Sequence, residues 1–82
     1  MTNQKTVVLF STSACSWCRT AKQYLKSNNI KFKEIDVSKD QQAAQDMVRR
    51  TGQMGVPVIM INSQTVIGFD KGKINRLLGI SN

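Results

Sequence analysis

The 82-residue chain contains no histidine, one proline and two cysteines. The absence of histidine excludes Ser-His and Cys-His catalysis, and it excludes any zinc site that requires imidazole. Two cysteines cannot form a four-thiolate metal cage within one chain. A single disulfide is also too few for a stapled secreted mini-protein. Several common classes of enzyme, metal site and secreted scaffold are therefore excluded by these counts.

Long apolar runs are also missing. The most apolar stretch, Val56 to Ile61, is far shorter than a membrane span of about 20 residues. The first ten residues lack the basic start and apolar stretch of a signal peptide. We therefore expect a cytoplasmic protein with no membrane partner. In that reducing compartment, a close cysteine pair is more often catalytic, redox-active or metal-binding than structural.

Acidic residues are scarce, with five Asp and Glu against twelve Lys and Arg, so the formal charge is +7. This balance suits anionic partners such as nucleic acid, an acidic protein or a small anionic thiol. The basic residues are spread along the chain, and no run of them is longer than Arg49-Arg50. Stacking aromatics are few, so a nucleic-acid partner is the least favoured of these, and a solvated basic surface explains the charge equally well.

The chain shows no linker, low-complexity segment or internal repeat, and its length predicts one domain, residues 1–82. Short β-branched runs predict strands, and apolar residues at spacings of three and four predict helices. The expected strands cover residues 6–10, 31–37, 57–61 and 64–67, and the expected helices cover 15–28, 38–52 and 70–79. The order β-α-β-α-β-β-α predicts an α/β fold with a four-stranded mixed sheet and three helices.

Capping residues support these helix boundaries. Ser38 and Gln41 have the spacing of a capping box, which predicts that Ser38 caps the second helix. Asp70 is the predicted N-cap of the third helix. Gly52 and Gly79 stand where left-handed residues would end the second and third helices.

The sequence Cys15-Ser16-Trp17-Cys18 stands where the first strand gives way to the first helix. A C-x-x-C pair near a βαβ pattern is a redox signature, because residues three apart are neighbours on a helix. Unpaired N–H groups and the helix dipole stabilise negative charge at the helix N-terminus. Cys15 is therefore the predicted nucleophile, and Cys18, on the apolar stripe with Ala21 and Leu25, is the predicted resolving thiol. A pair of small core residues explains Cys18 equally well, but it does not explain Cys15.

Together, the CSWC segment, the GVPV segment around Pro57 and the IGFD segment resemble the glutaredoxin family. The resemblance covers the chain from Thr6 to Ile80 and implies a thioredoxin-like fold. It also implies a monomeric thiol-disulfide oxidoreductase that reduces protein disulfides or glutathione mixed disulfides. Glutathione is then a co-substrate, and no tightly bound cofactor or metal is expected.

The resemblance also assigns binding roles. It implies that Pro57 is cis beside the cysteines and that the backbone of Val56 pairs with the substrate. The implied glutathione-binding residues are Trp17, Gln53, Val56, Pro57, Gly68, Phe69 and Asp70.

The chain departs from the family pattern at three positions. Thr12 stands where many glutaredoxins carry Lys, Gly55 replaces a common Thr, and Ser16 replaces the usual Pro. The first two departures favour an alternative, a redoxin that is reduced by thioredoxin reductase and donates electrons to ribonucleotide reductase. The third raises another alternative, a [2Fe–2S] cluster held between two chains by one thiolate from each and by glutathione.

Overall fold

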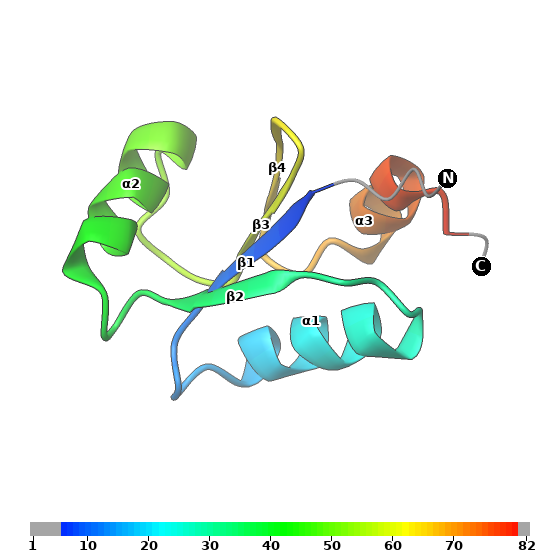
Figure 1. Ribbon diagram of the computed structural model, residues 1–82, viewed down its shortest axis with the longest axis horizontal. Coiled ribbons are helices and arrows are strands. Elements are labelled where there is room, and N and C mark those ends of the chain that lie inside the picture. Colours follow the sequence, from blue (N-terminus) through cyan, green and yellow to red (C-terminus); the bar gives the residue numbers. More distant parts are fainter. Residues whose placement is uncertain (1–5, 81–82) are drawn as a thin grey trace.

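The computed structural model describes residues 6–80 (Figure 1). Its strands and helices alternate in the predicted order. The elements are β1 (Val7–Ser11), α1 (Ser16–Ser27), β2 (Lys33–Asp36), α2 (Gln41–Thr51), β3 (Val58–Ile61), β4 (Gln64–Ile67) and α3 (Lys71–Leu78). Predicted boundaries differ from these by one to a few residues, because strand ends depend on which residues find a partner strand.

The four strands form one mixed sheet in the order β2-β1-β3-β4, as predicted. β1 pairs in parallel with β2 and antiparallel with β3, and β3 and β4 form an antiparallel hairpin. β1 is thus a central strand, which explains its run of apolar residues. In the β1–β2 register, Leu9 pairs with Glu34 and Ser11 pairs with Asp36. β2 is an edge strand, which is why it tolerates charged residues.

Alternate residues of β1 enter two separate cores, one on each face of the sheet. Leu9 packs with Leu25 of α1 and Ile74 of α3 on one face. Phe10 packs with Met47 of α2 on the other. α1 and α3 therefore cover one face of the sheet and α2 covers the other, an arrangement visible in Figure 1. This two-sided coverage holds the C-terminal end of β1 and the start of α1 in place.

The N-cap of α2 differs from the prediction. Asp40 is the cap, and its Oδ1 accepts a hydrogen bond from the N–H of Ala43 at 3.0 Å. Ser38 instead donates both its N–H and its hydroxyl to Oδ1 of Asp36. The predicted capping box of Ser38 and Gln41 is therefore wrong, because a carboxylate lies nearer the helix and the serine is engaged in the preceding turn.

The other caps match the sequence. Asp70 caps α3, accepting from the N–H of Lys73 at 3.1 Å. Gly52 and Gly79 end α2 and α3 with φ values of 72° and 71°. Glycine reaches this left-handed region without the steric cost that a Cβ would add.

Candidate active site

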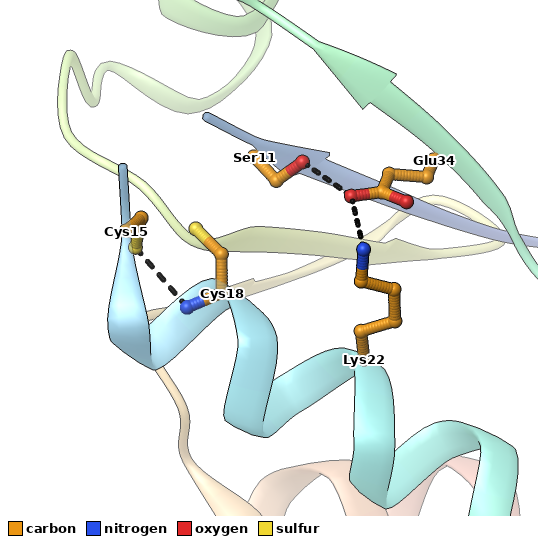
Figure 2. Close-up of polar contacts among 5 residues, drawn as sticks. All are labelled: Ser11, Cys15, Cys18, Lys22 and Glu34. Carbon is orange, nitrogen blue, oxygen red and sulfur yellow. Dashed lines mark hydrogen bonds and ion pairs between the residues drawn. The ribbon is translucent and has the colours of Figure 1, made fainter. Parts of the chain in front are cut away.

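Cys15 is the N-cap of α1, directly after the loop that leaves β1. Its Sγ accepts a hydrogen bond from the backbone N–H of Cys18 at 3.1 Å (Figure 2). The sulfur thus occupies the position that a serine or aspartate oxygen takes in an ordinary N-cap. A thiolate at this position would accept the same N–H and lie at the positive end of the helix dipole, as the sequence predicted.

Cys18 lies one turn into α1 and is only 2% exposed. The pKa of Cys18 is raised to about 12, mainly by burial and secondly by its side-chain hydrogen bond with Cys15. The negative charge of Glu34 also raises this pKa. Both cysteines are free thiols in this structure. The arrangement places one accessible thiol beside one buried, protonated thiol, which is the division of roles that a dithiol mechanism needs.

Alkylation should separate the two thiols. We expect iodoacetamide at pH 7 to label Cys15 and to spare Cys18, because a thiol with a pKa of about 12 is almost wholly protonated and this one is buried. The labelling rate of Cys18 should rise about tenfold for each pH unit, because the thiolate fraction grows by that factor below the pKa. Peptide mass spectrometry over a pH series measures both rates. Equal labelling of Cys15 and Cys18 at pH 7 would contradict the assignment of Cys15 as the accessible thiol and Cys18 as the buried, protonated thiol.

The segment that leads into β3 completes the site from the other side. The peptide bond between Val56 and Pro57 is cis, as the sequence resemblance implied. The Sγ of Cys15 lies 3.9 Å from the carbonyl oxygen of Val56. The N–H of Gly68 donates to the carbonyl oxygen of Pro57 at 2.9 Å, which ties the end of β4 to this segment. Residues 56–57 and 68 are thereby held beside the candidate nucleophile.

A shallow groove of about 330 Å³ is lined by Trp17, Val56, Pro57, Gly68 and Phe69. The rings of Trp17 and Phe69 are stacked with their centroids 6.3 Å apart, although Trp17 remains 62% exposed. The structure therefore brings together five of the seven residues to which the sequence resemblance assigned glutathione binding. That binding role itself stays a prediction.

The other two predicted residues, Gln53 and Asp70, do not line this groove. The backbone N–H of Gln53 donates to Oγ1 of Thr51 at 3.1 Å, just beyond the end of α2. The carboxylate of Asp70 serves as the N-cap of α3. Asp70 lies directly after Phe69, so its carboxylate is one residue away from the groove.

A second cavity, on the other side of the cysteines, contains residues that sequence reasoning did not single out. Oε2 of Glu34 accepts a hydrogen bond from the hydroxyl of Ser11 at 2.9 Å and lies 3.2 Å from Nζ of Lys22 (Figure 2). Glu34 and Lys22 line this cavity together with both cysteines. The available signal was the four-residue spacing of Cys18 and Lys22, which places both on one face of a helix.

The described residues contain no cluster of side chains that could serve as metal ligands. Across residues 6–80, no three His, Cys, Asp or Glu side chains form a group that could hold a metal ion. The alternative with a shared [2Fe–2S] cluster requires only Cys15 from each chain, and it stays a prediction. None of the helices described in residues 6–80 is long and apolar enough to cross a bilayer.

The chain matches known proteins in family, sequence and structure. The Glutaredoxin family model matches residues 7–66. An uncharacterized glutaredoxin-like 8.6 kDa protein in the rubredoxin operon of Clostridium pasteurianum is 39% identical over 72 residues, which cover 88% of this chain and 96% of that protein. These matches span most of the chain and include the CSWC segment.

Solved structures share the fold. The crystal structure of a mutant thioredoxin-like protein has a TM-score of 0.89 and 29% identity, covering 95% of this chain and 100% of that chain. The NrdH-redoxin of Escherichia coli, described as a glutaredoxin-like protein with a thioredoxin-like activity profile, has a TM-score of 0.78 and 25% identity. That match covers 87% of this chain and 92% of that chain. The thioredoxin-like fold implied by the sequence is confirmed.

Proposed function

The chain belongs to the glutaredoxin family, and from that premise we propose that it is a thiol-disulfide oxidoreductase working through the Cys15–Cys18 dithiol. The observation that carries the proposal is the cysteine pair itself. One sulfur caps the exposed end of a helix and accepts the N–H of the other cysteine, whose thiol is buried and protonated. This arrangement suits an attack by Cys15 followed by a second attack from Cys18.

The proposed reaction has two displacements. The Cys15 thiolate attacks one sulfur of a substrate disulfide, forms a mixed disulfide and releases the first substrate thiolate, which takes up a proton. Cys18 then loses its proton and attacks Sγ of Cys15, which breaks the mixed disulfide and releases the second thiol. The dithiol loses two electrons and becomes a disulfide. The substrate disulfide gains these two electrons and is reduced to two thiols.

We propose glutathione mixed disulfides as the substrate class and glutathione as the reductant. The groove beside Cys15 supports this, because its lining includes Val56, whose backbone can pair with a peptide, and the Trp17 and Phe69 rings, which can contact the body of a tripeptide. The carboxylate of Asp70, at the start of α3, is a candidate partner for the glutathione amine.

A second candidate function is the redoxin type that takes electrons from thioredoxin reductase and delivers them to ribonucleotide reductase. Two observations support it: the structural match to NrdH-redoxin, and Thr12 and Gly55, which stand where many glutaredoxins carry Lys and Thr. A missing lysine at position 12 removes a cation that a glutathione carboxylate could contact.

Reduction by the two electron donors decides between these functions. We expect the Cys15–Cys18 disulfide to be reduced by glutathione, with NADPH consumed through glutathione reductase. The matched measurement replaces that system with NADPH and thioredoxin reductase. If the disulfide is inert to glutathione but is reduced by thioredoxin reductase, the second function replaces the first. The Thr12→Lys variant serves as a control, because an added cation should strengthen glutathione use if the carboxylate binds there.

A further inference from the structure

The buried thiol of Cys18 must lose a proton before it can act. Only the thiolate is a nucleophile, and the pKa of this thiol is raised to about 12. With 2% of its surface exposed, Cys18 has little direct contact with bulk water. The second step of the proposed reaction therefore needs a group near Cys18 that accepts this proton.

The cavity behind the cysteines is the route by which the proton can leave. It has a volume of about 190 Å³, and Cys18 lines it together with Thr12, Ser13, Cys15, Arg19, Lys22, Glu34 and Asp36. A water molecule occupies about 30 Å³ in the liquid, so this polar cavity has room for several waters. Water can thus connect the thiol to a carboxylate across the cavity.

Strand alternation aims a carboxylate at this cavity. Leu9 and Glu34 are register partners and Ser11 follows Leu9 by two residues, so all three lie on the face of the sheet that α1 covers. Figure 2 shows Cys18 and Lys22 extending from α1 toward this face. The Ser11 hydroxyl at 2.9 Å and the Lys22 ammonium at 3.2 Å both contact Oε2 of Glu34 and orient its carboxylate.

The other charged groups of the cavity are poorer acceptors. Arg19 and Lys22 are cations with no lone pair for a proton. Oδ1 of Asp36 already accepts both the hydroxyl and the N–H of Ser38. The Ser38 hydroxyl, and to a lesser degree Lys39, lower the pKa of Asp36 and weaken it as a base. Oε2 of Glu34 also has two contacts, but Glu34 is the carboxylate of this cavity whose charge acts on the Cys18 thiol.

We propose that Glu34, oriented by Ser11 and Lys22, accepts the proton of Cys18 through water in this cavity when Cys18 attacks the mixed disulfide. The inference rests on the proposed dithiol function and adds a proton acceptor to its second step. The Cys18 proton passes through water to the carboxylate, and the sulfur electron pair forms the bond to Sγ of Cys15. The bond from Cys15 to the substrate sulfur breaks, and the departing thiolate is protonated in turn. Glu34 then returns its proton to solvent through its exposed side.

The two steps can be timed separately by acid quenching. Reduced protein is mixed with excess glutathione disulfide, and mass spectrometry follows the mixed disulfide and the intrachain disulfide. In Glu34→Gln we expect the second step to slow by about 10- to 100-fold, at or just below the lower end of the usual contribution of general base catalysis. The rate of the first step, the attack by Cys15, should stay within about twofold of wild type. A general structural defect would slow both steps.

Asp36→Asn is the matched control. It removes the same charge from the same strand and cavity, and it should leave both steps within about twofold of wild type. Glu34→Asp keeps a carboxylate and should recover part of the lost rate. If Glu34→Gln does not fold, Ser11→Ala provides the second variant. It removes one of the two contacts to Oε2 and should slow the second step alone.

Three results would overturn the inference. One is an unchanged second step in Glu34→Gln, and another is a faster one, which would mean that Glu34 acts only by raising the pKa of Cys18. The third is an equal loss in Asp36→Asn. A wild-type protein that forms neither the mixed disulfide nor the intrachain disulfide would instead contradict the proposed function, so the two failures are distinguishable.

Discussion

Replacing Cys15 with serine should lower disulfide-reducing turnover by at least about 1,000-fold, because a serine hydroxyl does not ionise to a useful nucleophile here. The substitution should leave the fold intact. Serine is a preferred N-cap residue, and its oxygen can accept the N–H of Cys18 as the sulfur does now. Turnover of a glutathione mixed disulfide measures the loss, and thermal unfolding checks that the variant is folded.

Cys18→Ser is the matched control for this prediction. It keeps the proposed nucleophile, so the mixed disulfide at Cys15 should still form, and added glutathione should still release the substrate. Protein disulfides that require the second cysteine should be reduced poorly. A Cys15→Ser protein with wild-type turnover would contradict the assignment of the nucleophile. If Cys18→Ser loses the first step and Cys15→Ser keeps it, then Cys18 is the nucleophile.

Truncating Leu25 should cause the largest loss of stability among the changes considered. Its side chain is fully buried between α1 and the sheet, where it packs in the core with Leu9 and Ile74. Leu25→Ala should lower the free energy of unfolding by about 3–4 kcal/mol, from lost burial and from the cavity left behind. Small domains are stable by only about 5–15 kcal/mol, so much of the stability would be lost. Urea denaturation measures the change.

Val48→Ala tests whether burial is the cause. Val48 also lies on a helix, but it is 38% exposed. Alanine favours helices, so neither substitution weakens the helix backbone itself. The Val48 change should stay within about 0.5 kcal/mol of wild type. Equal destabilisation by the two substitutions would mean that the core does not lie where the structure places it.

Most of the fold was predictable from local patterns. The apolar run of β1 predicts a strand and the apolar stripe of α1 predicts a helix, because the strand and helix periods differ clearly there. The N-cap of α2 was not predictable from spacing alone. Ser38 and Asp40 are both residue types that cap helices well. Asp40 is the cap in the structure, because Ser38 is hydrogen-bonded to Asp36 in the preceding turn.

The candidate site was predictable only in part. The roles of Cys15 and Cys18 followed from helix geometry, and the groove of Trp17, Val56 and Phe69 followed from a family resemblance. Glu34 gave no signal in the sequence, because a charged residue in an edge strand is ordinarily a solvated one. Gln53 does not line this groove, and its assignment to glutathione binding stays a prediction.

The sequence by itself determined what depends on neighbours along the chain. Helical geometry brings residues three apart together, so the C-x-x-C spacing and the strand–helix junction already predicted that Cys15 and Cys18 form one redox pair. Only the tertiary structure decided what surrounds that pair. The register of β1 against β2 brings Glu34 beside Ser11, and the packing of α1 brings Lys22 to both. These contacts join residues up to 23 positions apart. No local pattern encodes them, because they exist only once the sheet and the helix have packed.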